Sequence, residues 1–250
     1  MRNILSVLDR WIFPRKCIAC KTRLNEEEVV FCNTCRAKWI LATEKVCYSC
    51  RQRQIDCRCR PESVRGSSIT EYRHLLQFQS RIAKPVISAL KHHNYTELYD
   101  FIAKEFLGTI RQYPDIAPDN SVICYCPRRS QSVRRYGIDQ SKTLAQRFGG
   151  VSNIPVVDAL RHSAYSSDQK NLDAKQRYLN ALKSYALKDN LTEVIGKNII
   201  LVDDVVTTGA TAEACAKLLK TAGAEKILFF SVAKTERYHR KTWKKADRRK

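Results

Sequence analysis

Apolar residues follow two spacings after residue 66, and each spacing predicts a different kind of element. Continuous apolar runs predict buried strands at residues 72–78, 121–126, 154–157, 198–202 and 227–233. Recurrence at three and four residues predicts helices around residues 82–90, 98–110, 144–148 and 211–222. Strands alternating with helices indicate an α/β fold whose sheet is largely parallel and has helices on both faces.

Proline and glycine refine the ends of these helices. Pro85 is tolerable only in a first helical turn, because proline lacks the N–H that later turns need. We expect Gly149 and Gly150 to end the third helix and Gly223 to cap the fourth.

Residues 1–66 differ from the rest, because they are polar and lack long periodic segments. They hold eight of the 11 cysteines, in the pairs Cys17 and Cys20, Cys32 and Cys35, Cys47 and Cys50, and Cys57 and Cys59. We expect three parts: an N-terminal segment with a double zinc ribbon (1–66), an α/β domain (67–235) and a basic tail (236–250). The isolated Cys124, Cys126 and Cys215 lie among apolar residues and are expected in the core.

The paired cysteines indicate a metal module rather than disulfides. Two thiolates on a short turn converge on tetrahedral Zn²⁺, and eight ligands suit two ions; an iron–sulfur cluster is the alternative. Sequential pairing, the first four cysteines and then the last four, is the simplest arrangement. Residues 1–16 lack a small-residue cleavage site, so we expect an amphipathic helix rather than a signal peptide, and a reducing cytoplasm.

The chain carries a formal net charge of +20, and the positive charge is clustered. Arginines crowd residues 51–65, and lysines and arginines dominate residues 237–250. Contacts of basic residues with phosphates release counterions, so a polyanionic partner is expected; simple solubility is the alternative. No apolar run reaches the roughly 18 residues that a membrane span needs.

The most informative stretch is residues 199–211, where a buried strand leads through two acids into a loop and then a helix. Ligands of open α/β sheets bind beyond the carboxyl ends of strands, and a helix start offers free N–H groups to an anion. Gly209 permits close approach, and Thr207, Thr208 and Thr211 add hydroxyl donors. The loop therefore predicts a phosphate site.

Asp203 and Asp204 would repel a phosphate unless they contact something else. Ribose hydroxyls can donate to carboxylates, and Mg²⁺ is another partner for them. Alternatively, Asp204 caps the following turn.

This stretch resembles the phosphoribosyl pyrophosphate (PRPP) motif of type I phosphoribosyltransferases. The resemblance implies a Rossmann-like domain in which Asp203 and Asp204 hold the ribose. It also implies that the loop wraps the 5-phosphate through Val206, Thr207, Thr208, Gly209, Ala210 and Thr211.

The four cysteine pairs before such a domain resemble the ComF (ComFC-type) competence family over nearly the whole chain. Further similar elements are Tyr72, Leu90 with Lys91, residues 127–140, Ser166 with Gln169 and Leu172, and Arg177 with Asn180. The family implies natural transformation, single-stranded DNA and a ComF-type helicase partner.

Several basic residues are candidates for the pyrophosphate. Arg128, Arg129, Arg134 and Arg135 stand between a strand and a helix, and guanidinium groups suit bidentate phosphate contacts. Arg135 is the candidate catalytic arginine, and Gly137 would make the segment a mobile flap. The alternative is a solvated loop that contacts nucleic acid. Lys91 is either a pyrophosphate contact or a surface residue.

Two functions follow. The first is a competence-type DNA-handling protein that binds PRPP; Trp39, Tyr48 and Tyr72 could stack bases or belong to the core. The alternative is an active transferase that uses PRPP and Mg²⁺ and stabilises departing pyrophosphate electrostatically. The sequence shows no base-recognition hood, so the acceptor stays open.

Overall fold

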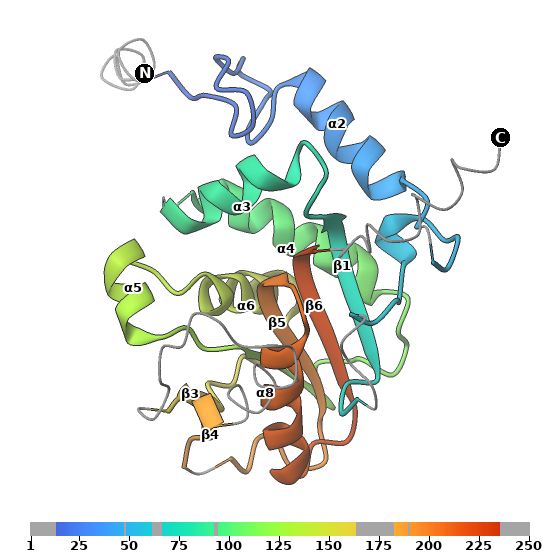
Figure 1. Ribbon diagram of the computed structural model, residues 1–250, viewed down its shortest axis with the longest axis vertical. Helices are drawn as coiled ribbons and strands as arrows, with labels where there is room; N and C mark the ends of the chain where they lie inside the picture. Colours follow the sequence, from blue (N-terminus) through green and yellow to red (C-terminus); the bar gives the residue numbers. More distant parts are fainter. Residues whose placement is uncertain are drawn as a thin grey trace, which may run out of the picture.

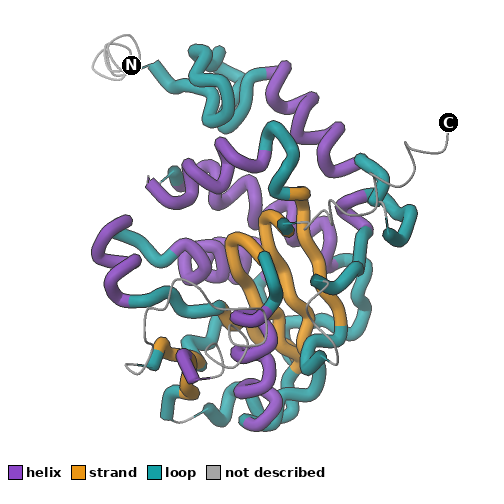
Figure 2. The backbone as a smooth tube through the Cα atoms, viewed as in Figure 1, coloured by secondary structure: helices purple, strands orange, loops and turns teal. Residues whose placement is uncertain are grey.

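A four-stranded parallel sheet forms the centre of the molecule (Figures 1 and 2). The computed structural model describes residues 14–47, 49–61, 67–92, 95–163, 183–189 and 191–235. The strand order is β1 (Glu71–Gln77), β6 (Ile227–Lys234), β5 (Asn198–Val206) and β2 (Ser121–Tyr125), and every neighbouring pair is parallel. The predicted α/β class and parallel sheet are confirmed.

Helices cover both faces of this sheet, because alternate residues of the central strands enter two separate cores. Ile200 and Val202 pack with α3 (Ala83–His92), α4 (Thr96–Ile110) and α6 (Gln140–Ser152). Ile199 and Leu201 pack with α8 (Ala210–Thr221) on the other face. In Figure 1, α8 lies in front of the sheet and α6 behind it. Cys124, Cys126 and Cys215 are buried in the α8 core, as predicted.

Two expectations near the third helix are wrong. Helix α6 continues through Gly149 and Gly150 to Ser152, and Asn153 ends it in the left-handed conformation, with φ 58°. Gly149 serves close packing, because a Cβ there would lie 2.5 Å from Val156 Cγ2. Residues 154–157 form no regular strand; a single parallel bridge joins Val156 to Ile123 of β2.

Strand β5 is longer than expected, since it contains both acids and ends at Val206. It continues because β6 accompanies it, with Val206 opposite Lys234. Helix α8 starts at Ala210, one residue before the expected start, and Gly223 (φ 96°) follows its end.

The cysteine-rich segment contains a helix that its sequence did not reveal, α2 (Asn33–Glu44), and a short 3₁₀ helix, η1 (Gln54–Asp56). Trp39 of α2 is 1% exposed and packs edge-on against Phe101 of α4, with ring centroids 4.9 Å apart. Tyr72 is equally buried. The suggestion that Trp39 and Tyr72 stack bases is therefore wrong, since both belong to the core.

Two smaller pieces complete the described structure. Helix α5 (Ser130–Tyr136) follows β2, and β3 (Leu160–His162) pairs antiparallel with β4 (Tyr185–Leu187). The expected N-terminal helix, Tyr48, the Ser166–Asn180 family elements and the basic tail lie outside the described residues. None of the described helices is long and apolar enough to span a membrane.

Candidate functional site

The predicted phosphate loop is the three-residue connection between β5 and α8. Gly209 has φ 77°, a left-handed conformation that favours glycine, and it sets the first residue of α8. Thr208 is buried and its hydroxyl accepts from the Ala210 N–H at 3.4 Å, whereas Thr207 is exposed. The loop thus presents the start of α8 at the carboxyl edge of the sheet, as the sequence predicted.

The two acids occupy different environments at this edge. Asp203 is half-buried, and its Oδ1 accepts from the Ser141 hydroxyl and from the Asp204 N–H, each at 2.8 Å. Asp204 is 3% exposed, and its Oδ1 accepts from the Val205 N–H at 2.7 Å. Burial, and then the charge of Asp204, raises the pKa of Asp203 to about 7, although Arg128 opposes the shift. Even beside Arg128, the pair therefore holds two negative charges poorly.

Arg128 supplies a positive charge to this pair. Its side-chain Nη2 forms an ion pair with Asp204 Oδ2. Its backbone N–H donates to Asp139 Oδ2 at 3.1 Å. Asp139 also caps α6 by accepting from the Lys142 N–H. Arg128, three residues after the end of β2, is therefore tied both to Asp204 of β5 and to the start of α6.

The remaining predicted ligands are not drawn into this contact. Arg134 and Arg135 are exposed on α5, where the Arg135 guanidinium lies 5.6 Å from the Tyr136 ring centroid, and Arg129 is half-buried. Gly137 (φ 76°) ends α5. Lys91 is half-buried near the end of α3.

Lys91 lies beside a contact between α3 and α4. The neighbouring Leu90 carbonyl accepts from the Tyr99 hydroxyl at 2.9 Å. Burial, and then the charge of Asp204, raises the pKa of Tyr99. Tyr99 therefore ties the end of α3 to α4.

Sequence reasoning missed three features of the site. Ser141 and Asp139 hold Asp203 and Arg128 in place; Asp139 lies near the end of the family-like segment 127–140, and Ser141 follows it directly. The β3–β4 pair was also missed; it places the centroids of the His162 and Tyr185 rings 4.8 Å apart. Strands of three residues are too short to give a periodic signal.

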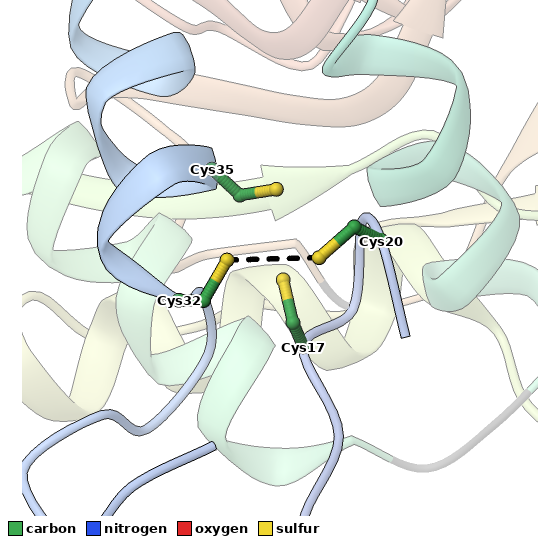
Figure 3. Close-up of side chains that lie close together, drawn as sticks. All are labelled: Cys17, Cys20, Cys32 and Cys35. Atoms are coloured by element: carbon green, nitrogen blue, oxygen red, sulfur yellow. Dashed lines mark hydrogen bonds between the residues drawn. The ribbon is translucent and has the colours of Figure 1, made fainter. Parts of the chain in front are cut away.

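The eight N-terminal cysteines form two groups of four (Figure 3 shows the first). Cys17, Cys20, Cys32 and Cys35 converge, as do Cys47, Cys50, Cys57 and Cys59, and the sulfur atoms of each group lie within 4.8 Å of one another. Sulfur pairs stand 3.6 Å apart in the first group and 3.7 and 3.9 Å in the second. Tetrahedral zinc with Zn–S bonds of about 2.3 Å needs sulfurs about 3.8 Å apart. Both groups could hold a metal ion, and their grouping follows the sequential pairing.

Each group contains a thiol that ionises readily. The Thr22 hydroxyl, assisted by the Thr22 N–H, lowers the pKa of Cys20 to about 6. Burial opposes ionisation of Cys47, but N–H groups of Cys50 and Ser49 lower its pKa to about 7. Thiolates are the form that binds metal, so both groups have a ligand prepared near neutral pH.

Residues 132–249 match the family of phosphoribosyl transferase domains. The chain is 26% identical to "Competence protein ComFC" of Bacillus subtilis over 230 residues, which covers 83% of this chain and 89% of that one. It is 31% identical to "Competence protein F" of Haemophilus influenzae over 101 residues, 40% of this chain and 44% of that one. The chain is a homologue of the ComFC-type competence proteins. Its α/β domain is a type I phosphoribosyltransferase fold, as the sequence suggested.

One solved structure, an adenine phosphoribosyltransferase, is similar at a TM-score of 0.41 and 14% identity, covering 62% of this chain and 76% of that one.

Proposed function

We propose that this chain is a competence-type protein of DNA uptake that binds PRPP with Mg²⁺ at the carboxyl ends of β5 and β2. The single observation that supports this most strongly is the succession of two acids, a glycine-containing loop and a helix start on one edge. The loop and the α8 N-terminus would hold the 5-phosphate. Asp203 and Asp204 would accept from ribose hydroxyls, and basic residues of the 128–135 segment and Lys91 would face the pyrophosphate.

The donor set suits a hydrated magnesium ion. Mg²⁺ prefers carboxylate and phosphate oxygens and keeps several waters, so two carboxylates and a pyrophosphate are appropriate ligands. The ion would neutralise the pyrophosphate when bound. Asp203 would then lose its proton, since a nearby cation favours the charged form.

The proposal is tested by calorimetric titration of the full chain with PRPP in excess Mg²⁺. We expect saturable binding of one PRPP per chain. Ribose 5-phosphate and inorganic diphosphate should each bind more weakly, because each engages only one part of the site. Equal affinity for PRPP and diphosphate would contradict the assigned ribose contacts.

We further propose that basic surfaces bind single-stranded DNA, which accounts for the net charge of +20. Residues 236–250 contribute eight lysines and arginines against two acids. Phosphate contacts give affinity without sequence readout and weaken steeply with salt. A ComF-type helicase is the partner that this role implies.

Truncation at Thr235 tests the DNA proposal. We expect the shortened chain to bind an oligonucleotide more weakly and with a shallower dependence of log affinity on log salt, measured by fluorescence anisotropy. Its PRPP affinity should not change, because β6 ends at Lys234. Equal DNA affinity of the two chains would show that residues 236–250 do not contribute to DNA binding. Adding PRPP to the DNA complex shows whether the two sites overlap.

We propose that each cysteine group holds one zinc ion and that the protein works in the reducing cytoplasm. The sulfur spacings support tetrahedral coordination, and all 11 cysteines are free. Residues 1–66 would form the metal module, residues 67–235 the PRPP-binding domain and residues 236–250 the DNA-binding tail.

The alternative is an active phosphoribosyltransferase. It is favoured by the His162–Tyr185 ring pair, whose centroids lie 4.8 Å apart and which could form a wall for a planar acceptor. Release of diphosphate from bound PRPP on addition of an acceptor would establish turnover. Binding without release supports the first proposal.

A further inference from the structure

Arg128 lies among three carboxylates at the candidate PRPP site. Its guanidinium pairs with Asp204, and Asp203 and Asp139 are its next electrostatic neighbours. Asp204 has only 4% of its side chain exposed, and Arg128 23%. The Arg128 guanidinium therefore contacts the same carboxylates that a divalent ion at this site would bind.

The contact leaves both partners incompletely satisfied. Among the described residues, the buried Arg128 Nε has no hydrogen-bond partner, and the contact of Arg128 Nη2 with the buried Asp204 Oδ2 is an ion pair without hydrogen-bond geometry. The two charges thus meet as an ion pair without the paired hydrogen bonds of a bidentate arginine–carboxylate contact. A ligand that offers anionic oxygens to Arg128 and a cation to Asp204 would satisfy both better.

We propose that Arg128 is an internal counter-ion that holds the metal position of the ligand-free site and is exchanged for Mg²⁺ when a diphosphate binds. This inference rests on the proposed PRPP site and concerns how that site is regulated. The exchange involves only the side chain of Arg128. The residue lies between β2 and α5, and its backbone N–H donates to Asp139. The guanidinium can therefore leave Asp204 while the backbone stays in place.

The exchange couples the two ligands. A divalent ion alone meets carboxylates that are already neutralised, so it binds weakly. A diphosphate alone must draw Arg128 away and leave Asp204 buried and uncompensated, which is unfavourable. Bound together, the ion takes the acids and the diphosphate takes the arginine, and each favours the other.

Binding of Mn²⁺ alone, followed by electron paramagnetic resonance, tests the exchange. We expect Arg128→Gln to bind Mn²⁺ at least about tenfold more tightly than the natural chain, because one neighbouring positive charge is removed. Arg111→Gln is the matched control: it removes the same charge from an exposed position at the end of α4 and should bind Mn²⁺ as the natural chain does.

Arg128→Lys provides a second variant if the glutamine variant fails to fold. It retains the charge, so Mn²⁺ alone should still bind weakly. It loses the planar fork, so inorganic diphosphate should no longer strengthen Mn²⁺ binding. Unchanged or weaker Mn²⁺ binding by folded Arg128→Gln would overturn the proposal, as would tight Mn²⁺ binding by Arg128→Lys.

The two proposals can fail separately. If the natural chain does not bind PRPP but Arg128→Gln gains Mn²⁺ affinity, the counter-ion role stands and the proposed ligand is wrong. If the natural chain binds PRPP but the glutamine variant gains nothing, the counter-ion role alone is refuted.

Discussion

Individual residues were predictable where their chemistry is unusual for their place in the chain. Two adjacent acids after an apolar run, or four cysteine pairs in a short segment, have few structural explanations. Ser141 gave no comparable signal, because a serine at a helix start is common. Its contact with Asp203 depends on α6 lying beside β5, which only the folded chain shows.

The titration of Asp203 lowers the free energy of unfolding as pH rises, whereas an aspartate with a lowered pKa would raise it. Its pKa of about 7 lies above the ordinary value of 3.8, so the folded chain binds a proton more tightly than the unfolded chain. The stabilisation is complete below about pH 4 and is lost as pH rises towards 7. We expect the melting temperature of the ligand-free chain, relative to that of Asp203→Asn, to fall between pH 5 and pH 8.

The asparagine variant serves as the reference because titrating groups away from the acidic pair are common to both chains and cancel. A difference in melting temperature that stays constant over this range would show that Asp203 is ionised throughout.

Elements were predictable where periodicity is long and burial is two-sided. The apolar runs of β5 and β6 are covered on both faces, and their sequences show it. Helix α2 was missed because its buried face, Cys35, Trp39 and Thr43, includes a polar residue, while the apolar Ile40 and Leu41 are exposed. The end of α6 was misplaced because Gly149 allows close packing against Val156 and does not mark the end of the helix.

The arginine segment shows a similar limit. Its position after a strand was predicted, but the sequence did not distinguish Arg128, which reaches the acids, from Arg134 and Arg135, which are exposed on α5. Separating them required the helical phase of α5 and the position of Asp204 across the sheet.

At the scale of the molecule, the cysteine module is joined to the edge and the carboxyl end of the sheet. Buried Arg73 of β1 donates to the Asp56 carbonyl at 2.9 Å, and Gln77 donates to Gln54 at 2.8 Å. Lys234 of β6 donates to the Cys59 carbonyl at 3.2 Å. The module therefore covers the β1 edge, which would otherwise be open to pairing.

Loss of metal should disturb this arrangement one group at a time. We expect two zinc ions per chain by mass spectrometry, and one in each of Cys20→Ser and Cys50→Ser. Structural zinc contributes about 10–16 kcal/mol to such modules, so each loss should unfold its own part. Trp39 belongs to the same apolar core as Cys17 and Cys35, so the tryptophan fluorescence of the chain, to which Trp11 and Trp243 also contribute, should shift to the red in Cys20→Ser and much less in Cys50→Ser.

The paired variants act as controls for each other, since each removes one thiol. Iron in place of zinc, or loss of both ions from either variant, would contradict two independent zinc sites.

The central claim is that Asp203 and Asp204 make this edge of the sheet a PRPP site. Calorimetry of the natural chain and of the Asp203→Asn, Asp204→Asn double variant with PRPP and Mg²⁺ tests it most directly. We expect the natural chain to bind one PRPP and the double variant, folded and with its metal content intact, to show no measurable binding. Equal PRPP affinity in the two chains would contradict the claim.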